Sequence, residues 1–168
     1  PDAEGLSGDT MRKKIVKRDK SCFACPARCG KFSIGGPGPY EGVRNEGPEY
    51  EDIFSLGSMC GHNDIEVVSA AERLCDDLGV DAIETGVSIA FAMECFERGL
   101  LSLKDTDGID LKFGRADLII PVIEKIAQRD GALGSLLAEG VKRAAEKIGN
   151  GSEHFAMHGK GLTYAGHS

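Results

Sequence analysis

The sequence has 168 residues, of which 41% are hydrophobic and 28% charged, a composition typical of a folded globular protein. A net charge of −7 and the absence of tryptophan argue against a nucleic-acid-binding surface, which usually needs a dominant basic face and aromatic stacking platforms. No apolar run approaches the roughly 20 residues that cross a bilayer, and the first residues show no secretion signal. We therefore expect a cytoplasmic protein that contacts neither nucleic acid nor membrane.

The N-terminal quarter combines a basic stretch, a cysteine cluster and a loop. Residues 12–20 contain six of the 20 Lys and Arg residues and lead into three closely spaced cysteines. Glycine and proline then recur between residues 33 and 48. Because neither residue type sustains a helix, we expect an ordered loop there, with short extended pieces at most. A second glycine-containing loop is predicted at residues 57–61.

Four helices are predicted in the rest of the chain. The first has Asn63 or Asp64 as its N-cap and Gly79 as its left-handed end. Apolar spacing places the others at residues 82–98, at 115–129 with a kink or restart at Pro121, and at 133–148.

Strand-like alternation is scarce, so the expected fold is mainly α, a multihelical domain with a loop-rich, cysteine-containing N-terminal segment. Residues 1–50 would form the segment with the cysteine cluster and the glycine- and proline-rich loop. Residues 51–168 would form the helical segment, packed with the first as one domain.

Cys22, Cys25 and Cys29 are the sharpest chemical signal in the sequence. Thiolates at offsets of three and four residues can converge on one soft-metal centre, and three local cysteines plus a distant one are typical of iron–sulfur clusters. A structural zinc site is the main alternative. It usually needs a second ligand pair, which only His154 and His158 offer at suitable spacing.

The other three cysteines are scattered along the chain. Cys75 and Cys95 lie on apolar faces of predicted helices, so we expect them to be buried thiols that behave as small hydrophobic side chains. Cys60 lies in a glycine-flanked loop, and whether it is the fourth cluster ligand stays open.

Four stretches together resemble the aldehyde ferredoxin oxidoreductase family of tungstopterin enzymes, and the resemblance covers nearly the whole chain. They are residues 20–30 around the cysteines, 47–51 (Gly-Pro-Glu-Tyr-Glu), 56–64, and 74–86 with its continuation to Cys95. The resemblance implies a bis-pterin tungsten or molybdenum centre beside a 4Fe–4S cluster. It also implies oxidation of a small aldehyde to a carboxylic acid, with ferredoxin as electron acceptor.

The resemblance assigns roles to particular residues. Cys22, Cys25 and Cys29 match the first three cysteines of the family's C-x₂-C-x₃-C motif; the fourth belongs to a second pterin-binding motif that this chain lacks. Glu49 and Glu51 lie where the family has an active-site glutamate. A carboxylate there can activate water or protonate substrate, and two exposed loop acids are a nearly equal alternative.

The family's first pterin-binding motif, D-x-x-G-L-D, is matched by Asp76, Gly79, Val80 and Asp81, with valine in place of leucine. Carboxylates suit the amino and ring N–H donors of a pterin. Without the resemblance, the same residues would be interpreted as a helix end with a solvated pair of aspartates.

Family enzymes also have an N-terminal β-rich pterin-binding domain and a C-terminal domain, and neither is present here. We therefore expect an internal fragment that is inactive alone, works with the remaining domains of the same enzyme, and self-associates as a homo-oligomer when its apolar surface is uncovered. The basic stretch can help to dock an acidic ferredoxin, or is a solvated face or a contact with the missing first domain. Relatives that reduce carboxylic acids or activated aromatic thioesters remain open. An alternative from another class is a zinc- or cluster-stabilised interaction module without redox activity.

Overall fold

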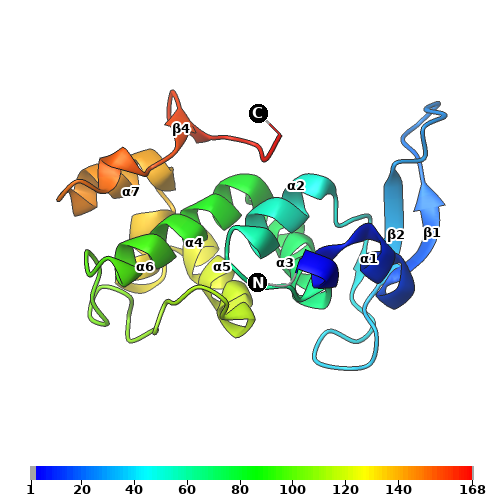
Figure 1. Cartoon of the computed structure of the whole chain (residues 1–168), viewed down its shortest axis with the longest axis horizontal. Coiled ribbons are helices and arrows are strands. Elements are labelled where there is room, and N and C mark those ends of the chain that lie inside the picture. The colour runs from blue at the N-terminus through cyan, green and yellow to red at the C-terminus, as the bar shows by residue number, and fades with distance from the viewer. Residues whose placement is uncertain (1–2, 168) are drawn as a thin grey trace.

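The computed structural model describes residues 3–167 as a helical body with a small sheet at one end (Figure 1). The helical elements are η1 (Ala3–Leu6), α1 (Gly8–Lys14), α2 (Tyr50–Asp52), η2 (Ile53–Ser58), α3 (Ile65–Leu78), α4 (Ala82–Glu97), η3 (Ala116–Leu118), α5 (Ile119–Gln128), α6 (Gly131–Leu137), α7 (Gly140–Ile148) and η4 (Ser152–His154). The strands are β1 (Val16–Lys20), β2 (Gly30–Ile34), β3 (Arg44–Asn45), β4 (His158–Gly159) and β5 (Leu162–Thr163). The expected mainly α, multihelical fold is confirmed.

Helix α4 lies at the centre of the helical body. Ten of its 16 residues are buried, because apolar and small side chains surround most of the helix. It contacts η2, α3, α5, α6 and α7, while the buried face of α3 packs against α5 and η2. Within residues 3–167, no helix is both long enough and apolar enough to cross a bilayer.

The ends of α3 and α4 lie where the sequence predicts them. The Asp64 carboxylate accepts the Glu66 and Val67 N–H groups at the start of α3. Gly79 ends this helix with φ of +68°, a left-handed conformation that costs glycine little because it has no Cβ. These caps confirm the first predicted helix, and α4 confirms the second.

The two later helices are each divided. The sequence predicts an interruption near Pro121 in the first of them, whereas the prediction of one continuous helix at 133–148 is wrong. Residues 116–118 form a 3₁₀ turn, and Pro121 lies in the first turn of α5, where a missing N–H breaks no intrahelical bond. The predicted helix at 133–148 is divided into α6, which ends at Leu137, and α7, which begins at Gly140. The Glu84 carboxylate accepts the Val141 N–H at the start of α7. Tertiary contacts thus decide these boundaries.

Residues 53–58 form a π-helix, which corrects the predicted loop at 57–61 for its first two residues, while residues 59–61 form a turn. The Met59 N–H donates to the Phe54 carbonyl five residues earlier, at 2.9 Å. This segment packs against α4 in the core. Its glycine, Gly57, is buried in the helix and packs closely against Leu6 and Val68.

A three-stranded antiparallel sheet, in the order β1–β2–β3, lies at one end of the molecule. Lys20 pairs with Gly30 at the end of the β1–β2 ladder, so residues 21–29 connect the strands and project beyond the helical body (Figure 1). β1 and the preceding α1 were not predicted from the basic stretch. The segment at 33–48 is the expected loop with short extended pieces, the end of β2 and the two residues of β3.

Buried polar contacts fasten the sheet to the helices. Ile15 is fully buried before β1, and Ser33 Oγ donates to the Gly47 carbonyl at 2.5 Å. Asn45 on β3 donates from Nδ2 to the Ser69 carbonyl and to the Glu72 carboxyl, both on α3. The polypeptide before residue 50 is therefore held directly against α3.

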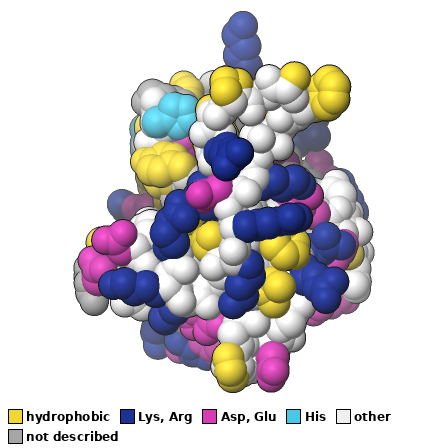
Figure 2. All heavy atoms as spheres, turned by 90° about the vertical axis from the view of Figure 1, so that its right-hand side faces the viewer, with side chains coloured by type: hydrophobic (Ala, Val, Ile, Leu, Met, Phe, Trp, Pro, Cys, Tyr) yellow, Lys and Arg dark blue, Asp and Glu magenta, His cyan; other side chains and the backbone are white. Residues whose placement is uncertain are grey.

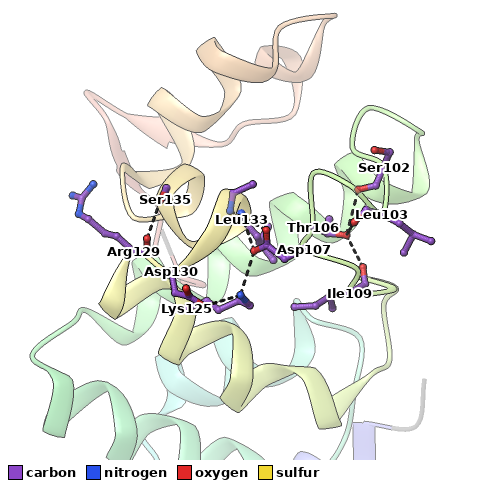
Figure 3. A network of polar contacts seen from close by, with 11 residues as sticks. Ser102, Leu103, Thr106, Asp107, Ile109, Lys125, Arg129, Asp130, Leu133 and Ser135 are labelled. Carbon is purple, nitrogen blue, oxygen red and sulfur yellow. Dashed lines mark hydrogen bonds and ion pairs between the residues drawn. The ribbon is translucent and has the colours of Figure 1, made fainter.

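The loop after α4 is held by a polar network around Asp107 (Figure 3). The Asp107 carboxylate accepts the Ala132 and Leu133 N–H groups at 2.9 and 3.3 Å, and pairs with Lys125 at 3.2 Å. Asp107 thus caps α6 from a distant loop, and the Ala132 N–H bond is the main cause that lowers the pKa of its carboxyl.

Candidate metal and cofactor site

The three clustered cysteines lie on the loop between β1 and β2, and all three are exposed. A turn closes at the start of the loop, where the Cys25 N–H donates to the Cys22 carbonyl at 3.1 Å. At its end, Lys31 Nζ donates to the Cys29 carbonyl at 2.7 Å. These contacts bend the loop around its own cysteines.

The thiols on this loop are compatible with a soft-metal centre, although their sulfurs are not gathered around one point. Within residues 3–167, no three His, Cys, Asp or Glu side chains converge closely enough to hold a metal ion. No hydrogen bond engages the sulfurs of Cys22, Cys25 or Cys29 among the described contacts, and the loop is exposed. Three unengaged thiols at this spacing suit three corners of an iron–sulfur cluster, with a fourth ligand from elsewhere.

The remaining cysteines are enclosed in the core, unlike the three on the loop. Cys60 is completely buried, and its thiol donates to the Ser55 and Gly86 carbonyls. Burial raises the pKa of Cys60, Cys75 and Cys95 to about 12 each, so the thiolate that a metal requires is strongly disfavoured. Cys75 and Cys95 are the buried thiols that the sequence predicts.

The cysteine loop borders an open cleft of about 350 Å³. Its lining includes Cys22 and the fully exposed Phe23 from the cysteine loop, together with Glu49 and Glu72. The structure therefore brings one predicted cluster ligand and one predicted active-site glutamate to the same cleft.

Four carboxyl groups lie near one another at this cleft: Glu49, Asp52, Glu72 and Asp76. Glu72 is nine-tenths buried, and burial together with the charge of Asp52 raises its pKa to about 8, while the hydrogen bond from Asn45 opposes this shift. Burial is also the main cause that raises the pKa of Asp52. Glu72 is buried and Asp52 is half-buried, and each negative charge disfavours ionisation of the other carboxyl, so the pKa values of both are raised.

The carboxyl pair holds the backbone of Glu49. The Asp52 carboxylate accepts the Glu49 N–H at 2.9 Å, and Asp52 is in turn hydrogen-bonded to Glu72, which Asn45 fixes from the sheet. Gly47 packs so closely here that an added Cβ would lie 2.4 Å from Glu72 Oε1. A continuous chain of contacts thus runs from β3 through α3 to the base of Glu49.

Glu51 lies apart from the cleft. Its carboxylate accepts the Gly166 N–H at 2.6 Å and pairs with the His167 ring of the C-terminal tail. The Gly166 bond is the main cause that lowers the pKa of Glu51. Of the two glutamates singled out in the sequence, only Glu49 faces the cysteine loop.

The residues of the predicted pterin motif lie at the α3–α4 junction. Asp76 stands one turn after Glu72 on α3, and its charge contributes to the raised pKa of Glu72. Asp81 caps α4, its Oδ1 accepting the Glu84 N–H at 2.7 Å. Gly79 makes the left-handed turn between them, and Val80 is half-buried. Their contact with a pterin remains a prediction.

Sequence reasoning missed Glu72, Asp52 and Asn45. A signal for Glu72 is visible in retrospect, since it occurs among Val68, Ala71 and Cys75 on the apolar face of α3. A glutamate on a buried helix face needs a polar partner, and the partner here comes from β3.

The chain matches the family model for aldehyde ferredoxin oxidoreductase, domains 2 and 3, over residues 1–168. The chain therefore belongs to the aldehyde ferredoxin oxidoreductase family. It is 41% identical over 156 residues to a tungsten-containing aldehyde ferredoxin oxidoreductase of Pyrococcus horikoshii, a match that covers 89% of this chain and 24% of the relative. It is 33% identical to the WOR-like subunit of an aliphatic sulfonate oxidoreductase of Pyrococcus furiosus, covering 90% and 25%.

Among solved structures, the active-site complex of benzoyl-coenzyme A reductase with a 1,5-dienoyl-CoA is similar, with a TM-score of 0.74 and 26% identity. That match covers 94% of this chain and 23% of the other. The chain thus spans about a quarter of the length of the relatives that it matches, and it corresponds to one part of larger oxidoreductases.

Proposed function

We propose that this chain is the part of a tungsten-dependent aldehyde oxidoreductase that supplies three ligands of a 4Fe–4S cluster, half of the pterin contacts and an active-site glutamate. The complete enzyme would oxidise a small aldehyde to its carboxylic acid and pass the electrons to ferredoxin. Cys22, Cys25 and Cys29 would hold the cluster. Asp76, Gly79, Val80 and Asp81 would contact a tungsten or molybdenum pterin.

The observation that carries this proposal is the shared cleft, which both Cys22 and Glu49 line. One proposed cluster ligand and the proposed proton-handling group therefore border the same space. The names of the relatives support the aldehyde reaction over its alternatives. Aldehyde oxidoreductases are 40–41% identical, compared with 33% for the sulfonate enzyme and 26% for the benzoyl-coenzyme A reductase.

The reaction balances as aldehyde plus water giving carboxylic acid, two protons and two electrons, the electrons leaving singly to two ferredoxin molecules. When bound, the tungstopterin and cluster accept and relay these electrons. In this chain, the Glu49 carboxylate would take the proton from the attacking water at its own oxygen. The protonated Glu72–Asp52 pair would hold the Glu49 backbone in place and keep a further negative charge out of the cleft.

The test is anaerobic iron–sulfur reconstitution of the chain and of a longer version that includes the following domain. We expect little iron in the chain alone, four iron and four sulfide in the longer version, and loss of both in its Cys25→Ser variant. Cys75→Ala is the matched control, because that thiol is buried away from the loop, and its iron content should be unchanged. One tightly bound zinc in place of iron would refute the proposal in favour of a structural module.

A further inference from the structure

Charge is divided unequally along this acidic chain. Residues 12–44 contain nine Lys or Arg against two Asp or Glu, a net of +7. The rest of the chain contains eleven against twenty-five, a net of −14. Such separation produces a strong local field even though the whole molecule is negative.

The fold gathers these cations at the end of the molecule that carries the sheet. We call this region, formed by α1, β1, β2, β3 and their connecting loops, the basic end. Figure 2 shows it facing the viewer, with Lys and Arg side chains spread across it. The cations of this end are Arg12, Lys13, Lys14, Lys17, Arg18, Lys20, Arg28, Lys31 and Arg44.

Many of these cations are available to a partner. Arg12 and Lys31 pair with Asp19, and Lys20 pairs with Glu46. In the described part of the chain, no carboxylate pairs with the other six, and all six are exposed. Their charge is therefore not neutralised within the chain.

The basic end also carries the cysteine loop, with an aromatic side chain beside the cysteines. Phe23, between Cys22 and Cys25, is fully exposed. Exposure of so large an apolar side chain to water is unfavourable and is informative where it occurs. Exposed aromatic residues surrounded by polar and charged groups are typical of contact sites. A partner bound here would lie directly over the three thiols.

We propose that the basic end is the docking surface for an acidic electron-carrier protein, a ferredoxin, with Phe23 as its apolar contact. This inference rests on the proposed function, because it takes the three cysteines to be the electron exit. Charge complementarity and position select the occupant: a surface with a net positive charge attracts an acidic carrier, and a carrier bound here lies beside the three thiols. The acidic remainder of a second copy would be attracted as well, so salt-dependent self-association through this end, without ferredoxin binding, would overturn the proposal. Long-range attraction of this kind mainly accelerates association and weakens as salt increases.

The test compares two charge-reversal variants of the complete, cofactor-loaded oxidoreductase. The first is Lys14→Glu with Lys17→Glu at the basic end. The matched control, Lys104→Glu with Lys147→Glu, changes two equally exposed cations on the loop after α4 and on α7. Binding of an acidic ferredoxin is measured by calorimetry at several salt concentrations. Aldehyde-dependent reduction of a small viologen dye is measured in parallel.

We expect the basic-end variant to bind ferredoxin roughly tenfold more weakly at low salt and to lose most of the salt dependence. The control variant should bind like the original protein, and dye reduction should be unchanged in both. Equal ferredoxin binding by the two variants would overturn the docking surface while leaving the proposed function intact. Failure of the original enzyme to reduce dye with any aldehyde would instead refute the proposed function, and calorimetry would still decide the docking.

A third outcome concerns the other parts of the enzyme. If the basic-end variant fails to assemble with the remaining domains, the neutral variant Lys14→Gln with Lys17→Gln is measured. Failure of that variant as well would show that the basic end is an internal interface, which overturns the proposal. Normal assembly with weakened ferredoxin binding would support it.

Discussion

Replacing Glu72 by glutamine tests whether a proton is stored beneath the cleft. Glutamine has nearly the same shape, can accept the Asn45 hydrogen bond and can donate to Asp52, so it imitates the protonated acid. At pH 5 we therefore expect the variant to unfold with nearly the same free energy as the original chain.

The difference should appear as the pH rises. The pKa of Glu72 is raised from 4.5 to about 8 in the folded chain, so between these values the folded state binds more protons than the unfolded state. Stability from this group is complete below pH 4.5 and is lost as the pH rises through 8. Each pKa unit corresponds to about 1.4 kcal/mol, which gives roughly 5 kcal/mol for Glu72 alone. Because Asp52 shares the proton, we expect about half of this.

The assay is urea unfolding followed by circular dichroism at intervals from pH 5 to pH 8.5, urea being chosen because it does not screen charge. The original chain should lose about 2–3 kcal/mol more than Glu72→Gln across this range. Glu124→Gln, an exposed carboxylate on α5, serves as the control and should follow the original chain. If Glu72→Gln shows the same pH dependence as the original chain, Glu72 is ionised in the folded state and the reasoning fails.

Three further substitutions test a helix cap, a close glycine contact and an exposed ion pair. Asp107→Asn removes the charge that caps α6 and should cost about 1 kcal/mol in urea unfolding; no measurable change would show that the cap in Figure 3 contributes nothing. Gly47→Ala should lower stability by about 2 kcal/mol in thermal unfolding, because its Cβ would clash with the buried Glu72 carboxyl. Gly36→Ala is the control and should cost less, because its Cβ would meet the half-buried Glu66 side chain. Equal costs for the two variants would contradict this reasoning. Asp77→Asn breaks only an exposed pair with Arg73 and should change the unfolding free energy by under about 0.5 kcal/mol; a loss above about 1 kcal/mol would be inconsistent with a solvated pair.

The sequence predicts those parts of the fold that local chemistry decides. Asp64 and Gly79 mark the ends of α3 because a capping carboxylate and a left-handed glycine act within a few residues. The break before α7 was missed because the Glu84 carboxylate that caps this helix is 57 positions away from Val141. No local pattern contains that contact.

The site follows the same division. Spacing alone singles out Cys22, Cys25 and Cys29, and the structure places them together on one exposed loop. Glu49 faces these cysteines and Glu51 does not. Glu51 is instead held by the C-terminal tail, because its carboxylate accepts the Gly166 N–H. The carboxyl pair beneath Glu49 depends on β3 lying against α3. Neither arrangement can be inferred from neighbouring residues.

The contrast between exposed and buried thiols has a consequence for how the protein is loaded. Six chemically identical side chains are sorted by folding into two sets, three accessible on a loop and three enclosed in the core. If the loop holds a cluster as proposed, a cluster-delivery protein that meets the folded chain can reach only the first set, so correct insertion needs no recognition of the ligands themselves. Loading before folding would lose this selectivity. Under that proposal, the order of folding and metal delivery would determine which thiols receive the cluster.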